Sequence, residues 1–207
     1  MLEEFEHNRV YIGEFENGER AGEGEETLSD GSKFKGTYQQ GKRNGFGILY
    51  GPDNYVIYRG EWKDGLQHGR GLLYCRELDE ELHQDSNIND GVYDGEFFKS
   101  KFCGSGKFTY NDRTIIEGQW LDGRPIDGDW TITYPEDGSK YYGFATFRVP
   151  SEKLRASVRS FSRGLTAASR ELLRVPLPHG FGSLLFPNGR RDVGSFVYGE
   201  KDAAYQC

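Results

Sequence analysis

The residues that could do chemistry are few in this 207-residue chain, and their spacing assembles no catalytic group. Zinc sites on helices use two histidines separated by three residues, and serine hydrolases use a Gly-x-Ser-x-Gly elbow, but neither pattern occurs. The Gly-x-Gly pairs of this chain do not open helices, so they are not phosphate cradles. We therefore expect no enzyme activity, no cofactor, no metal and no small-molecule substrate. The histidines are scattered: His7, His68, His83 and His179.

An acidic stretch at residues 75–90 imitates part of a calcium-binding loop. Asp85, Asn89 and Glu96 have the spacing of positions one, five and twelve of such a loop. However, the sixth position needs glycine for a sharp turn, and it is occupied by Asp90. The stretch also carries six carboxylates against a single arginine. We therefore interpret it as a solvated acidic loop inserted between repeats.

A second insertion, residues 150–176, has the pattern of a basic amphipathic helix. Its apolar residues step by four and three, Pro150 precedes the stripe as a start signal, and Pro176 marks the end. The apolar stripe consists of Leu154, Val158, Phe161, Leu165, Ala168 and Leu172. The opposite side carries the candidate partner-binding residues Arg155, Arg159, Arg163, Arg170 and Arg174.

Three interpretations of this predicted helix stay open. It packs on the protein's own sheet, because an apolar helical stripe is usually buried. It docks on an acidic protein surface, such as tubulin or another scaffold subunit. It attaches to an anionic membrane, although the net charge of −7 opposes this, as it opposes nucleic-acid binding. We expect packing on the sheet, with a protein partner contacting the arginines.

The elements that position these segments are set by a repeat. The unit reads aromatic-x-Gly-x-aromatic-x-x-Gly-x-x-x-Gly-x-Gly, and most units start 23 to 25 residues apart. Its aromatic and glycine positions alternate with period two, as in a strand, and a two-residue turn such as Asn17-Gly18 divides each unit. Each unit is therefore predicted to be a β-hairpin. The repeat aromatics are Tyr11, Phe15, Phe34, Tyr38, Tyr58, Trp62, Tyr93, Phe97 and Trp120.

The glycines predict how each hairpin packs. A two-residue turn at residues 17–18 would set Gly13 opposite Gly22, and Tyr11 opposite Gly24. Bare glycine positions in a sheet expose backbone unless aromatic rings lie across them. We therefore expect rings from neighbouring strands to cover the glycines, and rows of aromatic side chains on the sheet to contact a partner.

The pattern resembles the MORN-repeat family, the membrane occupation and recognition nexus repeats, over residues 11–147 and 179–200. Three departures stand out: Ser100 and Lys101 fall where the fourth unit should have its turn glycine, the glycine of the fifth comes one place late at Gly128, and Ala145 replaces an aromatic in the sixth. The resemblance implies an all-β repeat protein. Its expected form is an elongated, single-layer antiparallel meander of about seven hairpins with one inserted amphipathic helix.

The expected function is that of a non-enzymatic scaffold in a single domain over residues 1–207. The resemblance implies protein partners in a cytoskeletal assembly, most concretely a ciliary or flagellar axoneme. The alternatives are a peripheral membrane tether that binds anionic phospholipids and a regulatory adaptor subunit of an enzyme complex. No apolar run of about 18 residues and no signal peptide is present, so a cytoplasmic location is expected. Cys75, Cys103 and Cys207 are expected to be free thiols.

Overall fold

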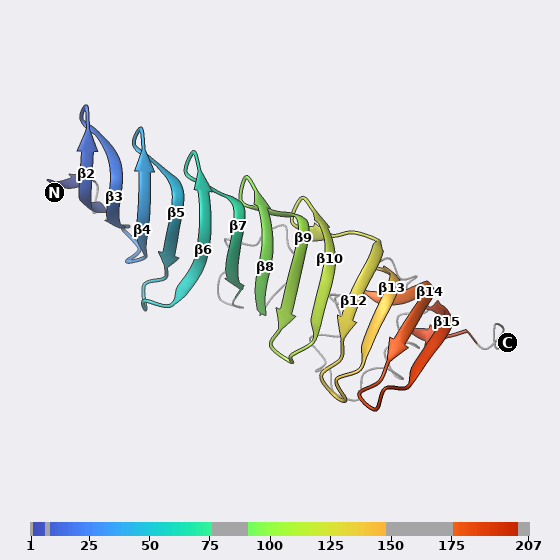
Figure 1. Cartoon of the computed structure of the whole chain (residues 1–207). Coiled ribbons are helices and arrows are strands. Elements are labelled where there is room, and N and C mark those ends of the chain that lie inside the picture. Colours follow the sequence, from blue (N-terminus) through green and yellow to red (C-terminus); the bar gives the residue numbers. More distant parts are fainter. Residues whose placement is uncertain (1, 7–8, 76–90, 148–175, 203–207) are drawn as a thin grey trace. The chain divides into compact units, whose positions relative to one another are not determined.

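The computed structural model describes residues 2–6, 9–75, 91–147 and 176–202, with side chains from residue 9 onward. In these ranges, sixteen strands form one open antiparallel sheet, with β11 pairing only to β10. The strand order follows the chain, as the labelled strands of Figure 1 show. The described residues contain no helix. These observations confirm the predicted all-β repeat meander. The predicted helix at 150–176 and acidic loop at 75–90 lie outside the described residues, except for Cys75 and Pro176.

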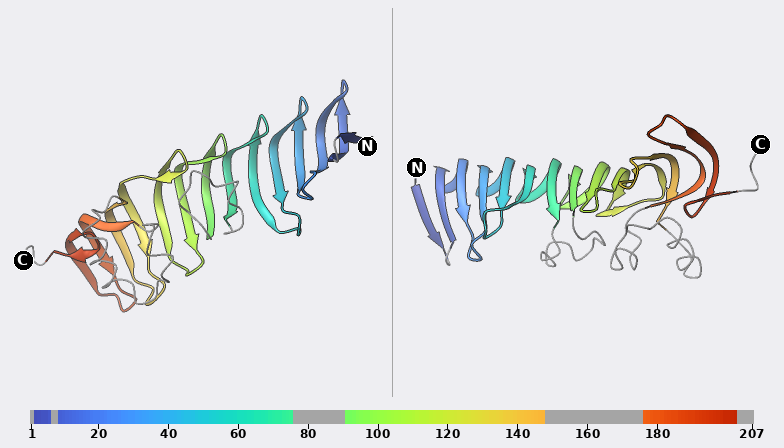
Figure 2. Two further views of the ribbon diagram at one scale, coloured as in Figure 1. Left: turned by 180° about the vertical axis from the view of Figure 1, so that it is seen from behind. Right: turned by 90° about the horizontal axis from the view of Figure 1, so that it is seen from below.

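The sheet divides into two compact units, and consecutive strands lie side by side within each of them (Figure 2). The boundary falls within β9 (Lys101–Tyr110), after Cys103. Whether the chain is a single domain, and whether it is elongated, stay predictions. The first unit contains β1 (Leu2–Glu6), β2 (Arg9–Glu16), β3 (Glu19–Thr27), β4 (Lys33–Gln39), β5 (Lys42–Tyr50), β6 (Val56–Lys63), β7 (Leu66–Cys75) and β8 (Gly91–Phe98). The second contains β10 (Ile115–Leu121), β11 (Arg124–Pro125), β12 (Gly128–Thr133), β13 (Lys140–Thr146), β14 (Leu177–Leu185), β15 (Arg191–Val197) and β16 (Glu200–Lys201).

Two-residue turns close the hairpins because both of their residues adopt positive φ. Asn17 and Gly18 have φ of 52° and 82°, as type I′ turns require. Lys99 and Ser100 adopt the same conformation, with φ of 49° and 64°, although neither is glycine. The Ser100 N–H donates to the Gln67 carbonyl at 2.9 Å, and its hydroxyl accepts from the Gln67 N–H at 3.2 Å. The serine therefore ties its hairpin to the preceding one through two hydrogen bonds.

A different turn joins one hairpin to the next. Asp30 Oδ1 accepts from the Ser32 N–H at 2.8 Å, and the Gly31 N–H donates to the Leu28 carbonyl at 3.0 Å. This Asx-type arrangement stabilises a residue of positive φ after the aspartate. The same turn occurs at Asp112, Asp137 and Asn188. These four linkers therefore share one turn construction.

The predicted register within a hairpin was wrong beyond the first three residue pairs. Glu14 does pair with Ala21, as a two-residue turn requires, but Gly13 then pairs with Gly24 and Tyr11 with Glu26. A β-bulge causes the difference, because two extra residues of β3 lie between these pairs. The bulge places Gly22 at φ 57°, a conformation that favours glycine.

The late glycine of the fifth unit splits its return strand. Trp120 pairs with Pro125 in β11, whereas Glu117 pairs with Thr131 in β12. The intervening bulge therefore contains one residue more than the bulge of the first hairpin. Asp127 fixes this bulge by accepting from the Thr146 hydroxyl at 3.0 Å.

We predict that Arg113→Gly stabilises the protein. Arg113 holds φ 72° in its linker turn, where the equivalent turns have glycine or asparagine. A residue with a Cβ is strained in this region, so relieving the strain should raise the free energy of unfolding by about 0.5–1 kcal/mol in urea denaturation. Gly138→Ala, at the equivalent position with φ 72°, should lower it by a similar amount. A loss of stability in Arg113→Gly would contradict this account of the turn.

Candidate functional site

One face of the sheet, which we call the aromatic face, carries the first aromatic residue of each unit over a pair of glycines. The Tyr58 ring covers Gly60 on its own strand and Gly71 on the next strand, and these two glycines pair with each other. A Cβ at Gly71 would overlap the Tyr58 ring. Tyr11, Phe34 and Tyr141 cover equivalent pairs. The expected aromatic cover of the glycines is present, but each first-position ring comes from the same hairpin as the pair it covers.

The fifth hairpin reaches the same result with a different residue. Its first position is Ile116, which has no aromatic ring, and the ring over Gly118 belongs to Trp130 on the returning strand. The Trp130 indole N–H donates to the Ile126 carbonyl at 2.9 Å, in the bulge. A ring over glycine is therefore retained even where the repeat sequence has diverged.

Where the first aromatic is a tyrosine, its hydroxyl donates to a backbone carbonyl next to the bulge. Tyr58 donates to the carbonyl of Glu61 at 2.9 Å, and Tyr141 donates to the carbonyl of Phe144 at 2.7 Å. Burial, followed by the charge of Asp129, raises the pKa of Tyr141 to about 12, so this phenol stays protonated at neutral pH. These tyrosines are structural hydrogen-bond donors.

The second aromatic of the second to fourth units packs toward the preceding hairpin. Trp62 lies edge-to-face on Phe34, with ring centroids 5.1 Å apart, and its indole N–H donates to the Gly47 carbonyl at 3.3 Å. Trp120 donates in the same way to Gly106 at 3.1 Å. Trp62 thus holds its hairpin to the preceding one by an aromatic contact and a hydrogen bond, whereas Phe97 makes the aromatic contact alone, with Tyr58.

These contacts correct the interpretation of the repeat aromatics as a partner surface. All of them are buried in the core of the sheet except Phe15, which is half-buried. The side chains of the aromatic face are therefore buried by the protein's own packing and are not exposed to a partner. The buried repeat aromatics are Tyr11, Phe34, Tyr38, Tyr58, Trp62, Tyr93, Phe97 and Trp120.

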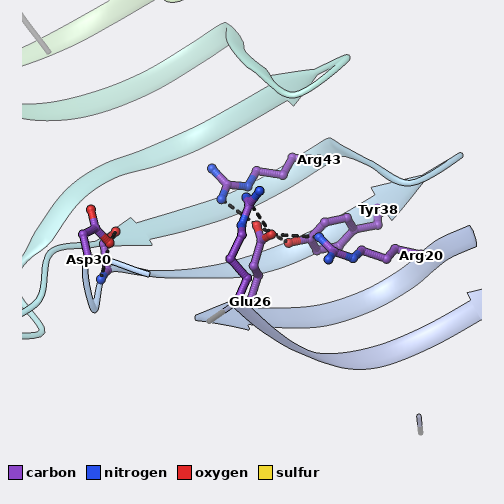
Figure 3. A network of polar contacts seen from close by, with 7 residues as sticks. Arg20, Glu26, Asp30, Tyr38 and Arg43 are labelled. Atoms are coloured by element: carbon purple, nitrogen blue, oxygen red, sulfur yellow. Dashed lines mark hydrogen bonds and ion pairs between the residues drawn. The ribbon is translucent and has the colours of Figure 1, made fainter. Parts of the chain in front are cut away.

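A buried carboxylate joins the first two hairpins on the aromatic face, a feature that the sequence reading missed (Figure 3). Glu26 is only 2% exposed, and its Oε1 accepts from Arg20 at 2.8 Å and from Arg9 at 3.0 Å. Its Oε2 accepts from Arg43 at 2.7 Å and from the Tyr38 hydroxyl at 3.3 Å. We call these five residues the Glu26 cluster. The cluster links strands β2 to β5 through side chains.

The electrostatics of the Glu26 cluster favour the ionised carboxylate. Burial alone would raise the pKa of Glu26, but the hydrogen bond and charge of Arg43, with the charges of Arg9 and Arg20, lower it below its ordinary value. The Arg43 guanidinium also stacks 4.5 Å from the Phe34 ring centroid. The described contacts of Glu26 are all internal, and the arrangement is that of a structural ion cluster.

The repeat itself contained the signal for Glu26. The second residue after the last glycine of a unit is apolar in the other units that keep this glycine, and it is buried or half-buried there. Glutamate at this position predicts a buried charge that needs arginine partners. The equivalent residues are Leu49, Leu73, Phe108 and Leu184.

Other chemistry is sparse in the described part of the chain. Its histidines, cysteines and carboxylates form no group of three or more that could hold a metal ion. Cys75 is buried and Cys103 is half-buried, and burial, followed by Glu96, raises the pKa of Cys103. Within the described ranges, no helix has the length and apolarity needed to cross a lipid bilayer. The candidate partner-binding arginines lie outside the described residues. They are Arg155, Arg159, Arg163, Arg170 and Arg174.

The other side of the sheet, which we call the opposite face, presents side chains to solvent. In the first of the two compact units, cross-strand pairs form a row that mixes apolar residues with charges of both signs. Lys35 and Glu25 form an ion pair at 2.7 Å within it. The row consists of Ile12, Glu25, Lys35, Ile48, Arg59 and Leu72.

The fold and these contacts define a repeat protein made of antiparallel hairpins, each of which packs on its neighbours. Comparison with known families gives the particular class. A family model described as MORN repeat matches residues 11–33, 34–54, 58–77, 93–115 and 177–190. These five segments are MORN repeats, which confirms the resemblance seen in the sequence. The fifth hairpin, with its longer bulge and no ring at Ile116, lies outside the matches.

Among curated proteins, the chain is similar to alsin. It is 31% identical to alsin of Rattus norvegicus and 30% identical to alsin of Mus musculus, over 91 residues in each case. The matched region covers 43% of this chain but only 5% of the alsin sequences.

MORN repeats suggest a repeat-type binding or scaffold role, and the family is generally non-enzymatic.

The ionised Glu26 should stabilise the protein in a pH-dependent way. Glu26→Gln should lower the free energy of unfolding at pH 7 by about 2 kcal/mol, less than for a fully dry ion pair because Arg9 is 42% exposed. Since the pKa is lowered in the folded state, this contribution is fully present above the ordinary carboxyl pKa and is lost as the pH falls through the folded value. The check is thermal unfolding between pH 7 and pH 3, where the two proteins should converge at the acid end. Glu19→Gln, at an exposed carboxylate, serves as the control; equal effects of the two changes would refute the cluster's role.

Trp62→Ala should cost about 3 kcal/mol of unfolding free energy, because it removes a buried ring and leaves a cavity between two hairpins. Phe46→Ala is the matched control, since Phe46 is 51% exposed, and it should stay within about 0.5 kcal/mol. Urea denaturation of both variants tests this. Similar values for the two would show that the aromatic face does not supply the core.

Proposed function

We propose that this protein is a non-enzymatic scaffold that binds protein partners in a cytoskeletal assembly. The observation that carries the proposal is the division of labour between the faces of the sheet. Rings and glycines on the aromatic face are used for internal packing, whereas the opposite face presents interleaved apolar and charged side chains. Non-obligate protein interfaces are about as apolar as the rest of a protein surface, so this mixed face is available to a protein partner.

The finer parts of the proposal concern location and contact residues. The axoneme of a cilium or flagellum is the proposed location, on the basis of the MORN-repeat class. The arginines of residues 150–176 are the proposed contact for an acidic protein surface, because they gather on one side of a predicted helix in an otherwise acidic chain.

Proximity labelling in the cells that express the protein tests both parts. A biotin-ligase fusion should label cytoskeletal or ciliary proteins above background, and fluorescence should place the fusion on the same structure. Enrichment of membrane proteins alone, with the fusion spread along membranes, would reject the scaffold proposal in favour of a membrane tether.

Reversing Arg159 and Arg163 to glutamate should reduce labelling of the main partners severalfold, because like charges would then face an acidic surface. The isolated protein should unfold at an unchanged temperature, since both residues contact solvent or partner under this proposal. Lys42→Glu with Lys63→Glu is the charge-matched control on exposed strand positions. An equal loss of labelling in the control would show that net charge, and not the arginine side, determines binding.

A further inference from the structure

The second compact unit carries a group of exposed apolar side chains on the opposite face, and the contacts described so far do not explain their exposure. Cross-strand pairing places Tyr142, Ser183 and Val193 in one row, so residues two positions from them on the same strands share that face. Phe181 is 71% exposed within this group. We call the group the apolar patch, and it consists of Tyr142, Phe144, Phe181, Leu185 and Val193.

The apolar patch departs from the pattern of the other hairpins. The residue before the second aromatic lies on the opposite face, and in the first five units it is polar. A polar side chain at this position can accept a hydrogen bond from the backbone of the bulge. The Arg70 N–H, for example, donates to Glu61 Oε1 at 3.0 Å. Phe144 offers no such acceptor and packs beside Gly180. The equivalent residues are Glu14, Thr37, Glu61, Glu96, Gln119 and Phe144.

The hairpin that becomes apolar is the one that carries the long insertion. Thr146 and Leu177 form its last pair, so residues 147–176 leave and re-enter the sheet at the same point. Phe144 lies two residues before that point, and Phe181 lies four residues after it. Large apolar patches on a protein surface mark sites that bind another segment, protein or ligand.

We propose that residues 152–174 of this same chain occupy the apolar patch. Their apolar stripe, from Leu154 to Leu172, supplies side chains of the right chemistry, and seating it on Phe144 and Phe181 turns the arginine side away from the sheet. The tether at both ends gives the segment an effective concentration of roughly millimolar, well above that of a second copy or a partner in the cell. The proposal goes beyond the scaffold function, because it concerns the seat of the segment and not what the arginines bind.

Limited trypsin digestion of the full chain tests the seat, because the segment contains five arginines. In the native protein, cleavage after Arg159 and Arg163 should be slow. Phe181→Asp should accelerate it about tenfold or more, since cleavage follows the population in which the segment is released. Phe46→Asp, at a 51% exposed phenylalanine of the other unit, should change the rate less than about twofold.

A second variant keeps the test sharp. Leu165→Asp should also accelerate cleavage, and combining it with Phe181→Asp should add little, because both changes break one contact. Fast cleavage in the native chain, or strictly multiplicative effects of the two changes, would overturn the proposal. So would a dimer in sedimentation that Phe181→Asp dissociates without a change in cleavage, which would assign the patch to a second copy. If the trypsin test rejects the binding of residues 152–174 to the apolar patch, the result of reversing Arg159 and Arg163 still stands. The docking proposal and the scaffold proposal are therefore tested independently.

Discussion

The contact on which the rest of the structure depends is an aromatic ring lying over two paired glycines. Tyr58 lies over Gly60 and Gly71, and a side chain at Gly71 would overlap its ring. The glycines allow the ring to lie flat across both strands, and the ring in turn shields backbone that glycine leaves bare. Because Tyr11, Phe34 and Tyr141 repeat this contact and second aromatics such as Trp62 reach the preceding hairpin, the core is a chain of small contacts. No single hairpin could bury such a face alone.

Departures from the repeat show which parts of the unit are physically necessary. Ser100 replaces a turn glycine, yet the turn keeps its conformation and gains a hydrogen bond to Gln67. Trp130 supplies the ring over Gly118 where Ile116 cannot. Glu26 replaces an apolar core residue, and three arginines and Tyr38 compensate for its burial. The requirement is therefore a filled position and satisfied backbone groups, and the residue type can vary.

Much of this fold follows from the sequence, because turn chemistry and strand periodicity are local. The Asn-Gly turn at 17–18 and the alternation around Tyr11 both predict what is observed. The register could not be predicted from the turn alone, since the bulge at Gly22 inserts two residues that leave the strand pattern unchanged. The arginine partners of Glu26 come from β2, β3 and β5, so their convergence depends on the pairing of several strands. The exposure of Phe181 likewise appears only once its strand is assigned to a face.

A double-mutant cycle between Tyr58 and Gly71 measures the central contact most directly. Gly71 has no positive φ, and the three atoms nearest to a Cβ added there all belong to the Tyr58 side chain. Gly71→Ala should cost about 2 kcal/mol in the otherwise native chain, as overpacking of a core does, but less than about 0.5 kcal/mol when Tyr58 is already alanine. Urea denaturation of the four proteins gives the coupling. The same cost in both backgrounds would contradict the claim that ring and glycine act as one unit.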